Sequence, residues 1–457
     1  MRDQREREVT DVGVRAHAPG RAVEASGRSD RLTRAGSRAA ERLWPTAKML
    51  ARPLGLYLAS RVVVYVAIGV VIMLHVGIST QHFTGPWPAS SPGRPLFEAL
   101  GTWDGGWYMR IATHGYTTAM HPPSSFTAST AFLPVLPVLL RISQFVSGLA
   151  ILQAAVLTSF LIGAVASICV WLFVRHLTDT PTADRGTALW CFFPGAVTLS
   201  LVYTEGLLVV FAVVCLFALM RGRWLLAGIA AAGASATAPE GLALFACCAW
   251  AAGAAILAKR AEPPLAVGRH LAVSGDGTTS TMPASRWRRW STTTSPLLAP
   301  LLAPMGWLVY QAYLWRRTGD LTFWYQVEKR FFNGGFHPWA VTGHLEQQAI
   351  NQPGVPSFVI PTLGLLVLAA AAVALWLWKP PAVVTIYAAV TMALVLSSGV
   401  LGARPRFFIA AFPFVVALAR PVRGPAFHAL LGVCAGALGL LTLILVSFIN
   451  LHLAFTP

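Results

Sequence analysis

"AILQAAVLTSFLIGAVASICVWLFV", residues 150–174, is an apolar stretch without a single charged side chain. A helix of about 18 such residues is long enough to cross the hydrocarbon core of a bilayer. Arg175 and His176 follow directly, and basic residues are favoured at the cytoplasmic ends of membrane spans. The stretch therefore predicts a transmembrane helix, and it sets the fold class of the chain.

The whole chain has the composition of a polytopic membrane protein. Of its 457 residues, 55% are hydrophobic and only 12% are charged, about half the charged share of a soluble domain. We predict an all-α fold with about eleven spans, several of them short. The predicted spans are 54–76, 150–174, 186–204, 206–220, 224–239, 240–258, 297–314, 358–378, 382–402, 407–419 and 427–448. A further apolar segment, 131–148, holds two Pro and an Arg, and we expect it to be re-entrant.

The distribution of charge orients this topology and divides the chain into two domains. Residues 1–52 carry twelve basic and seven acidic side chains and predict a disordered, basic cytoplasmic tail. Residues 53–457 form the membrane domain. The positive-inside rule places the basic loop 259–293 in the cytoplasm, and loops 77–148 and 315–357 outside. We expect a multi-pass plasma-membrane protein with a cytoplasmic N-terminus and short helices in its first outer loop.

One outer loop fits this orientation less well than the others. Loop 315–357 carries four Lys or Arg against three acids, although an outer loop is expected to be poor in basic residues. Either the span count is off by one, or these charges meet an anionic ligand.

The excess of basic residues does not indicate a nucleic-acid partner. The net charge is +17, but no recognition module accompanies it, and cytoplasmic segments of membrane proteins favour Lys and Arg. The six Cys all lie in apolar runs without the paired spacing of a zinc site or a disulfide framework. We therefore expect buried thiols, no metal and no nucleic acid, with the lipid bilayer as the main surrounding.

The polar stretch "GTWDGGWYMRIATHGY", residues 101–116, follows the first span. If 103–113 is helical, Asp104, Trp107 and Tyr108 share one face. Aromatic rings beside an acid can cradle a sugar, and the same Trp and Tyr, with Trp103, can equally form an interfacial belt. Asp104 can act in chemistry or simply cap a helix.

Charged residues also recur at the outer ends of the predicted spans. Charges at membrane depth are costly and usually face a cavity, so we predict one polar chamber that opens outward. The alternative is that individual members only flank span ends in the headgroup layer. The five residues are Asp104, Glu205, Glu240, Arg404 and Arg406.

Three stretches resemble the phosphatidylinositol-glycan class V (GPI mannosyltransferase 2) family and its bacterial members. The first is "WDGGWYMRIATHGY" with the following "TAFLPVLPVLLR"; the second is "FFPGAVTLSLVYTEGLL" (192–208), and the third is "GARPRFFIAAFP" (402–413). The first is the most specific. The matching residues in these stretches are Trp103, Asp104, Tyr108, Ile111, Ala112, Gly115, Tyr116, Leu133, Pro134, Pro137, Phe193, Pro194, Tyr203 and Glu205. In "SATAPEGLAL", Ala238 stands where the family often has an Arg, which puts the donor, or activity itself, in question.

The resemblance implies a membrane-embedded glycosyltransferase of the C superfamily. Such enzymes take a polyprenyl-phosphate sugar, here mannose, on the outer face, without a nucleotide or cofactor, and carry a catalytic acid in the first outer loop. Asp104 would then be the general base that deprotonates a hydroxyl of a glycan or glycolipid acceptor in an inverting displacement. Arg404 and Arg406 would stabilise the leaving phosphate.

The remaining candidate residues are expected to bind substrate. They are Trp103, Trp107, Tyr108, Tyr203 and Glu205, and for Glu205 pairing with an Arg is the alternative. No Gly-rich phosphate loop or Asp-x-Asp motif favours a nucleotide-sugar enzyme. Two other hypotheses stay open: a polytopic transporter or lipid flippase, and a catalytically inactive member of the same fold.

Overall fold

The computed structural model describes residues 49–74, 94–117, 125–261, 295–332, 347–352, 356–398 and 403–447. The chain divides into two units, Met1–Arg52 and Pro53–Pro457. Only the last four residues of the first unit are described, as the beginning of the helix Met49–Met73. The predicted tail therefore lies almost wholly outside the described residues, as does most of loop 259–293.

Every element named in these ranges is a helix, which confirms the predicted all-α class. After Met49–Met73 the elements are α2 (Arg94–Leu100), α3 (Asp104–His114), η1 (Ser125–Ala131), α4 (Val135–Ser147), α5 (Ile151–Leu177), α6 (Thr180–Phe192), η2 (Pro194–Leu199), α7 (Glu205–Met220), α8 (Trp224–Ser235), η3 (Pro239–Leu242), α9 (Ala243–Ala261), α10 (Leu298–Leu302), α11 (Met305–Thr318), α12 (Phe323–Phe331), α14 (Pro356–Trp378), α15 (Ala382–Leu396), α16 (Pro405–Ala410), α17 (Phe412–Ala419) and α18 (Gly424–Ser447). Residues 347–351 are also helical.

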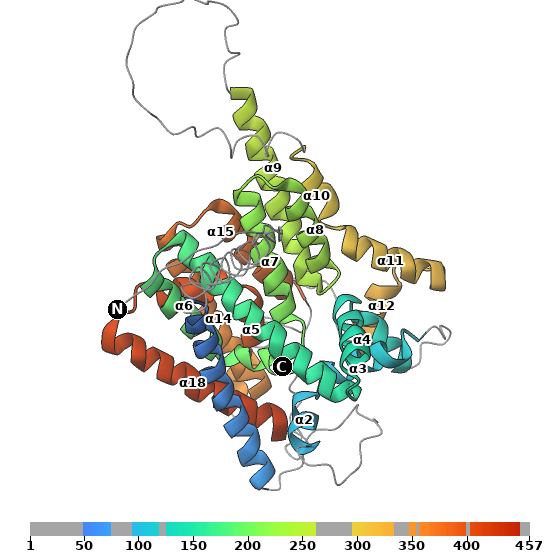
Figure 1. Cartoon of the computed structure of the whole chain (residues 1–457), viewed down its shortest axis with the longest axis vertical. Coiled ribbons are helices and arrows are strands. Elements are labelled where there is room, and N and C mark those ends of the chain that lie inside the picture. The colour runs from blue at the N-terminus through green and yellow to red at the C-terminus, as the bar shows by residue number, and fades with distance from the viewer. Residues whose placement is uncertain are drawn as a thin grey trace, which may run out of the picture. The chain divides into compact units, whose positions relative to one another are not determined.

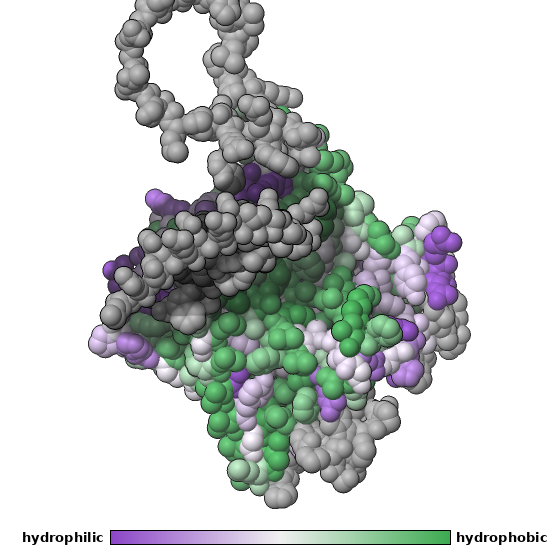
Figure 2. Space-filling model, in the orientation of Figure 1, coloured by the Kyte–Doolittle hydropathy of each residue, from purple (hydrophilic) through white to green (hydrophobic). Residues whose placement is uncertain are grey.

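Five helical segments of the described residues are long and apolar enough to cross a bilayer. They are Met49–Met73, Ile151–Leu177, Pro239–Ala258, Phe358–Trp378 and Gly424–Ser447. Figure 2 shows a largely apolar surface over the described part of the face in view. Both observations agree with a polytopic helical membrane protein, because lipid-facing surfaces of spanning helices are apolar.

The other predicted spans fold as shorter or broken helices. The stretch 186–204 divides at Pro194 into α6 and η2, and 297–314 divides at Pro304 into α10 and α11. The stretch 407–419 divides into α16 and α17 beside Pro413. Proline lacks a backbone N–H and clashes with the preceding turn, so a helix interior breaks there. Hydropathy alone does not register these breaks, and the predicted span count was based on hydropathy.

The predicted re-entrant segment 131–148 contains α4, which has only 13 residues and cannot cross a bilayer. The N–H of Val135 donates to the carbonyl of Ala236 at 3.3 Å, which ties the start of α4 to the end of α8. Figure 1 shows α3, α4, α11 and α12 gathered at one side of the described fold. The helices α3 and α4 and the pair α11–α12 therefore form one region.

A buried guanidinium holds the broken segment between α6 and α7 in place. Arg61 lies in the helix Met49–Met73 and is 1% exposed. Its Nη1 donates to the Ala196 carbonyl at 2.7 Å and to Ser200 Oγ at 2.6 Å, and its Nη2 donates to the Cys191 carbonyl at 3.1 Å. The ring of Tyr57 lies 5.0 Å from the guanidinium carbon. The cation thus satisfies carbonyls that the end of α6 and the turn η2 would otherwise leave unpaired.

We expect Arg61→Leu to destabilise the fold by about 3 kcal/mol or more, because buried carbonyls lose charged donors. Thermal unfolding of the detergent-solubilised protein measures this effect. The matched control is Arg221→Leu, since Arg221 is exposed and only stacks on Phe217 at 4.8 Å, a contact worth about 1 kcal/mol or less. Equal melting temperatures for the two variants would contradict the role given to Arg61.

Candidate functional site

The structure brings Asp104 and Arg406 together although they lie 302 positions apart in the chain. Asp104 is the first residue of α3, and Arg406 is the second residue of the short helix α16. Arg406 Nη1 donates to Asp104 Oδ2 at 3.1 Å, and the two side chains are 17% and 32% exposed. The pair is therefore only partly covered, and a ligand can reach the carboxylate.

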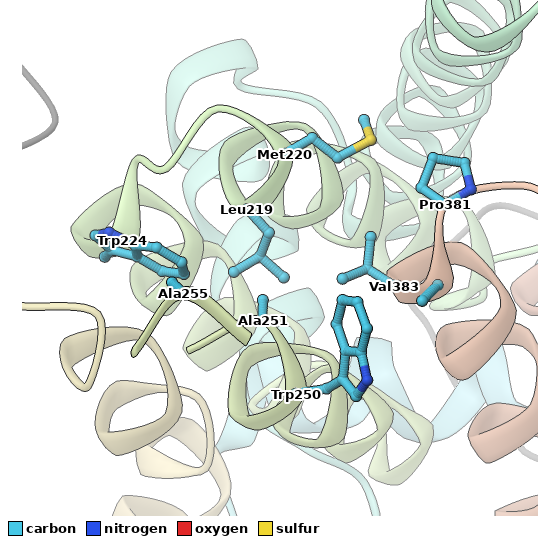
Figure 3. Close-up of a pocket in the computed structure, with 9 residues that line it drawn as sticks. Leu219, Met220, Trp224, Trp250, Ala251, Ala255, Pro381 and Val383 are labelled. Atoms are coloured by element: carbon cyan, nitrogen blue, oxygen red, sulfur yellow. The ribbon is translucent and has the colours of Figure 1, made fainter. Parts of the chain in front are cut away.

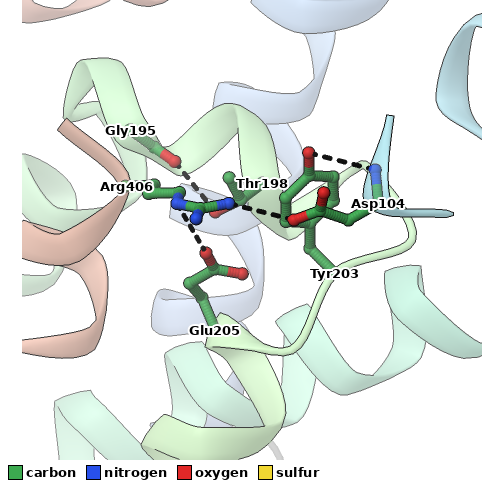
Figure 4. Close-up of polar contacts among 6 residues, drawn as sticks. All are labelled: Asp104, Gly195, Thr198, Tyr203, Glu205 and Arg406. Atoms are coloured by element: carbon green, nitrogen blue, oxygen red, sulfur yellow. Dashed lines mark hydrogen bonds and ion pairs between the residues drawn. The ribbon is translucent and has the colours of Figure 1, made fainter. Parts of the chain in front are cut away.

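Arg406 contacts a second carboxylate on its other side. Its Nε lies 3.9 Å from Glu205 Oε1 at the start of α7, and Glu205 is 6% exposed. Among the described residues, Glu205 Oε2 has no hydrogen-bond partner. Figure 4 shows the guanidinium of Arg406 between the two carboxylates. One cation thus joins two acids from different helices, and one oxygen of the cluster is left available.

Tyr203 is a further member of the cluster around Arg406. Its ring centre lies 5.9 Å from the guanidinium carbon of Arg406. The backbone N–H of Asp104 donates to Tyr203 Oη at 3.4 Å, as the dashed line in Figure 4 marks. The hydroxyl therefore accepts from the first N–H of α3, a group that the helix itself leaves unpaired. Tyr203 is 3% exposed, so little of its ring is open to a substrate.

Glycines allow the segment that carries Arg406 to approach its neighbours closely. A Cβ on Gly195 of η2 would overlap the carbonyl of Pro405, and a Cβ on Gly364 of α14 would overlap the carbonyl of Ala403. Gly105 of α3 likewise lies against Val202, where an added Cβ would come within 3.1 Å of the Val202 Cβ. Backbone on backbone contact fixes both sides of the ion pair more rigidly than long side chains would.

Trp103 holds the start of α3 in a strained conformation. Its φ is 59° with ψ −128°, a region that residues with a side chain rarely adopt. Its Nε1 donates to the carbonyl of Leu445 in α18 at 3.1 Å. Such strain persists only where the surroundings enforce it, and it is often found beside functional groups. Here the strained residue immediately precedes Asp104.

Trp107 and Tyr108, expected to share a face with Asp104, both pack on Phe132. The ring of Trp107 stacks on Phe132 at 5.9 Å, and Tyr108 meets it edge-on at 5.1 Å. Tyr108 is 6% exposed. These contacts join α3 to the segment before α4. Most of the Tyr108 ring is buried in this packing and is not open to a substrate.

The remaining predicted charges also lie near the ion pair. Arg404 is 6% exposed and interacts electrostatically with Asp104 and Tyr203. Glu240 of η3 interacts with Arg406. The other four predicted charges thus all interact with Arg406, two of them through ion pairs. Ala238, where the family often has an Arg, is extended and 6% exposed, so the cations near Asp104 come from the segment 404–406 instead.

The sequence analysis missed several residues of this region. Glu328 of α12 interacts electrostatically with Asp104, Glu240 and Arg406. Its only sequence signal was the mixed charge of loop 315–357. Gly195 could have been found in the Phe-Pro-Gly stretch of residues 193–195, and Arg61 could have been found as the single charge inside the first predicted span.

An apolar pocket lies at the opposite end of α7 from Glu205. It sits where the α7–α8 turn and the start of α15 meet α9, as Figure 3 shows. Its lining contains no ionisable side chain, so it offers no group for proton transfer. The lining residues are Leu219, Met220, Trp224, Trp250, Ala251, Ala255, Pro381, Ala382 and Val383.

The described part of the chain is an all-helical fold in which two carboxylates contact one guanidinium. Residues 90–259 match the family described as Mannosyltransferase (PIG-V). The match confirms the resemblance found in the sequence. It covers Asp104, Tyr203 and Glu205, whereas Arg404 and Arg406 lie beyond it. No curated protein and no solved structure matches the chain.

We expect Gly195→Ala to lower mannosyl transfer by roughly a hundredfold, because the added methyl group displaces Pro405 and with it Arg406. Initial rates with equal amounts of folded protein test this. Gly253→Ala in α9 is the matched control, since a Cβ there meets nothing within 4 Å. Transfer by Gly195→Ala within twofold of the control would show that the close approach is dispensable.

Proposed function

We propose that this mannosyltransferase moves mannose from a polyprenyl-phosphate donor to a hydroxyl group of a glycan or glycolipid acceptor. The observation that carries the proposal is the ion pair between Asp104 and Arg406. It places a carboxylate able to accept a proton beside a guanidinium able to receive a phosphate. A lipid-linked donor suits a site built between membrane helices.

In the proposed reaction, Asp104 takes the proton of the acceptor hydroxyl as its oxygen attacks C1 of mannose. The bond between the acceptor oxygen and C1 forms while the bond between C1 and the phosphate oxygen breaks. The electron pair of the broken bond stays on the polyprenyl phosphate, and the configuration at C1 inverts. This geometry parallels an inverting glycosidase in which the acceptor replaces water.

Arg406 has two successive partners in this scheme. Without donor its Nη1 pairs with Asp104. A donor phosphate competes for the same guanidinium, because Arg binds two phosphate oxygens through its planar fork. Donor binding thereby frees the carboxylate for the acceptor, while Glu205 continues to hold Nε at 3.9 Å. Arg404, buried beside Asp104, adds a second positive charge for the leaving phosphate.

The proposed site faces the outside of the plasma membrane, and the N-terminus lies in the cytoplasm. The support is the charge distribution: the loops richest in Lys and Arg fall on the opposite side of the predicted topology from Asp104. Polyprenyl-phosphate sugars need no metal or nucleotide at the transfer step, which agrees with a cluster of acids and guanidinium groups.

The test is transfer by purified protein in liposomes that contain a membrane extract as the source of acceptor. Labelled polyprenyl-phosphate mannose is compared with labelled nucleoside-diphosphate mannose. We expect label on the acceptor only with the lipid-linked donor. Transfer from the nucleotide donor alone would refute the donor class. A transporter or flippase would move the lipid across the bilayer without labelling acceptor, and an inactive member would do neither.

A further inference from the structure

The hairpin of α11 and α12 is anchored beside the cluster around Arg406. The N–H of Trp307 donates to Ser235 Oγ at 3.3 Å, and this hydroxyl donates to the carbonyl of Ala303 at 2.8 Å. Gly306 lies against the carbonyl of Ala232, where an added Cβ would overlap it. The start of α11 is therefore fixed to the end of α8, next to the turn η3 that carries Glu240.

The same hairpin is attached to the first outer loop. Trp324 Nε1 donates to the Ala131 carbonyl at 3.2 Å, and Tyr310 Oη donates to the Thr130 carbonyl at 2.7 Å. The ring of Phe332 meets Phe132 edge-on at 5.6 Å. Phe132 also stacks on Trp107 of α3. The hairpin and the helix that begins with Asp104 thus both pack on the same segment, residues 130–132.

Two hydrogen-bond donors in this hairpin are buried and unused. Among the described residues, Trp307 Nε1 and Gln311 Nε2 have no hydrogen-bond partner. They lie four positions apart in α11, and such residues project from one face of a helix. An unsatisfied buried donor costs about 1–3 kcal/mol. Two on one face indicate a site that is completed by a polar ligand.

Glu328 of α12 supplies a third polar group. It interacts electrostatically with Asp104 of α3, Glu240 of η3 and Arg406 of α16, and with Tyr310 of α11. Burial, with Glu240 and Asp104, raises the pKa of Glu328 to about 8, although Arg406 opposes the rise. Below this pH the carboxyl group is mostly protonated, so it can both donate and accept a hydrogen bond.

The outer part of this hairpin is hydrophilic. Arg316, Arg317, Lys329 and Arg330 are exposed on it, and Figure 2 shows hydrophilic residues at the edge of the fold that Figure 1 labels α11. A polar glycan can approach from such an edge, whereas the prenyl chain of the donor requires an apolar surrounding. The surface of the hairpin therefore suits a polar acceptor better than the prenyl chain of the donor.

We propose that Trp307, Gln311 and Glu328 form a subsite that binds the hydroxyl groups of a sugar-bearing acceptor opposite the Asp104–Arg406 pair. The inference rests on the proposed function, because it identifies the acceptor side of that site. Two donors and a protonated carboxyl group suit sugar hydroxyls, because each hydroxyl both donates and accepts. Trp324, whose ring meets Trp307 at 6.2 Å, adds an aromatic surface beside them.

The test measures binding, so that it does not depend on turnover. Purified protein in nanodiscs is titrated with octyl mannoside, octyl glucoside and octyl glucosaminide, with octanol and polyprenyl phosphate as reference ligands. We expect at least one glycoside to bind the natural protein more tightly than octanol does. Trp307→Phe and Gln311→Leu should each weaken that glycoside about tenfold, the loss of one buried hydrogen bond. The affinity of both variants for polyprenyl phosphate should stay within twofold of the affinity of the natural protein.

The matched control is Trp315→Phe, because Trp315 lies on the same helix and is 49% exposed. It should leave glycoside binding unchanged. Glycosides that bind no better than octanol, or variants that bind them as the natural protein does, would overturn the subsite. Failure of the proposed function instead appears as tight glycoside binding without any transfer from a lipid-linked donor.

A pH series separates Glu328 from a purely structural role. Glycoside binding by the natural protein should weaken between about pH 7 and about pH 9, as Glu328 ionises and loses its donor. Glu328→Gln keeps a neutral donor and acceptor, so its affinity should stay flat over the same range. An identical pH dependence in the two proteins would refute the role of Glu328.

Discussion

Asp104→Asn is expected to lower kcat about a thousandfold, the usual contribution of a general base. The amide has the size of the carboxylate but cannot take the acceptor proton. Arg406 Nη1 at the same time loses the partner that it holds at 3.1 Å in the free enzyme, and so becomes more available to the donor phosphate. We therefore expect the KM for the lipid-linked donor to stay the same or to fall. Initial rates over a range of donor concentrations separate the two constants.

The control for this result is the same chemical change at an exposed aspartate. Asp179 is the N-cap of α6 and accepts from the N–H of Thr182 at 2.8 Å. Asn caps a helix about as well as Asp, so Asp179→Asn should transfer mannose at the natural rate. If Asp104→Asn retained more than about a tenth of the natural kcat, a carboxylate could not be the base at this position.

Arg406→Lys is the second large effect that we expect. Lys keeps the positive charge but lacks the planar fork that contacts Asp104 and Glu205 together. The loss of one preorganised donor to a developing anion lowers the rate about a hundredfold or more. We expect this loss in kcat/KM for the lipid-linked donor. Competition by free polyprenyl phosphate should weaken in parallel.

Arg420→Lys gives the matched control, because Arg420 lies at the C-terminal end of α17 and stacks on Trp378 at 5.3 Å. A double variant adds a sharper criterion. Asp104 and Arg406 share one ion pair, so the losses in Asp104→Asn/Arg406→Lys should be smaller than the sum of the single losses. Additive losses would mean that the two residues act independently.

The sequence alone was sufficient for the fold class and for the charged cluster. Asp104, Glu205 and Arg406 could be predicted because a charge is rare at the end of an apolar segment and has few structural reasons to be there. The helix expected over 103–113 begins at Asp104 and ends at His114. That agreement follows from the aromatic and apolar residues spaced three and four apart.

The sequence was not sufficient to predict where a single proline breaks a helix. It was also not sufficient to predict which residues far apart in the chain meet at the site. Hydropathy averages do not register Pro194 or Pro304, so each broken segment was predicted as one span. Gln311 and Trp307 belong to an apolar stretch with nothing local to distinguish them. Glu328 was one acid in a loop of mixed charge. Only the folded chain shows which buried donors lack a partner and which acids face Arg406.

The long separation between Asp104 and its partners has a consequence for biosynthesis. The residue that pairs with it lies 302 positions later, and the carbonyl that anchors its neighbour Trp103 lies 342 positions after that tryptophan. During translation, the segment that carries the acid leaves the ribosome long before either partner does. Premature termination ahead of α16 would therefore yield an inserted polypeptide without a complete reaction centre.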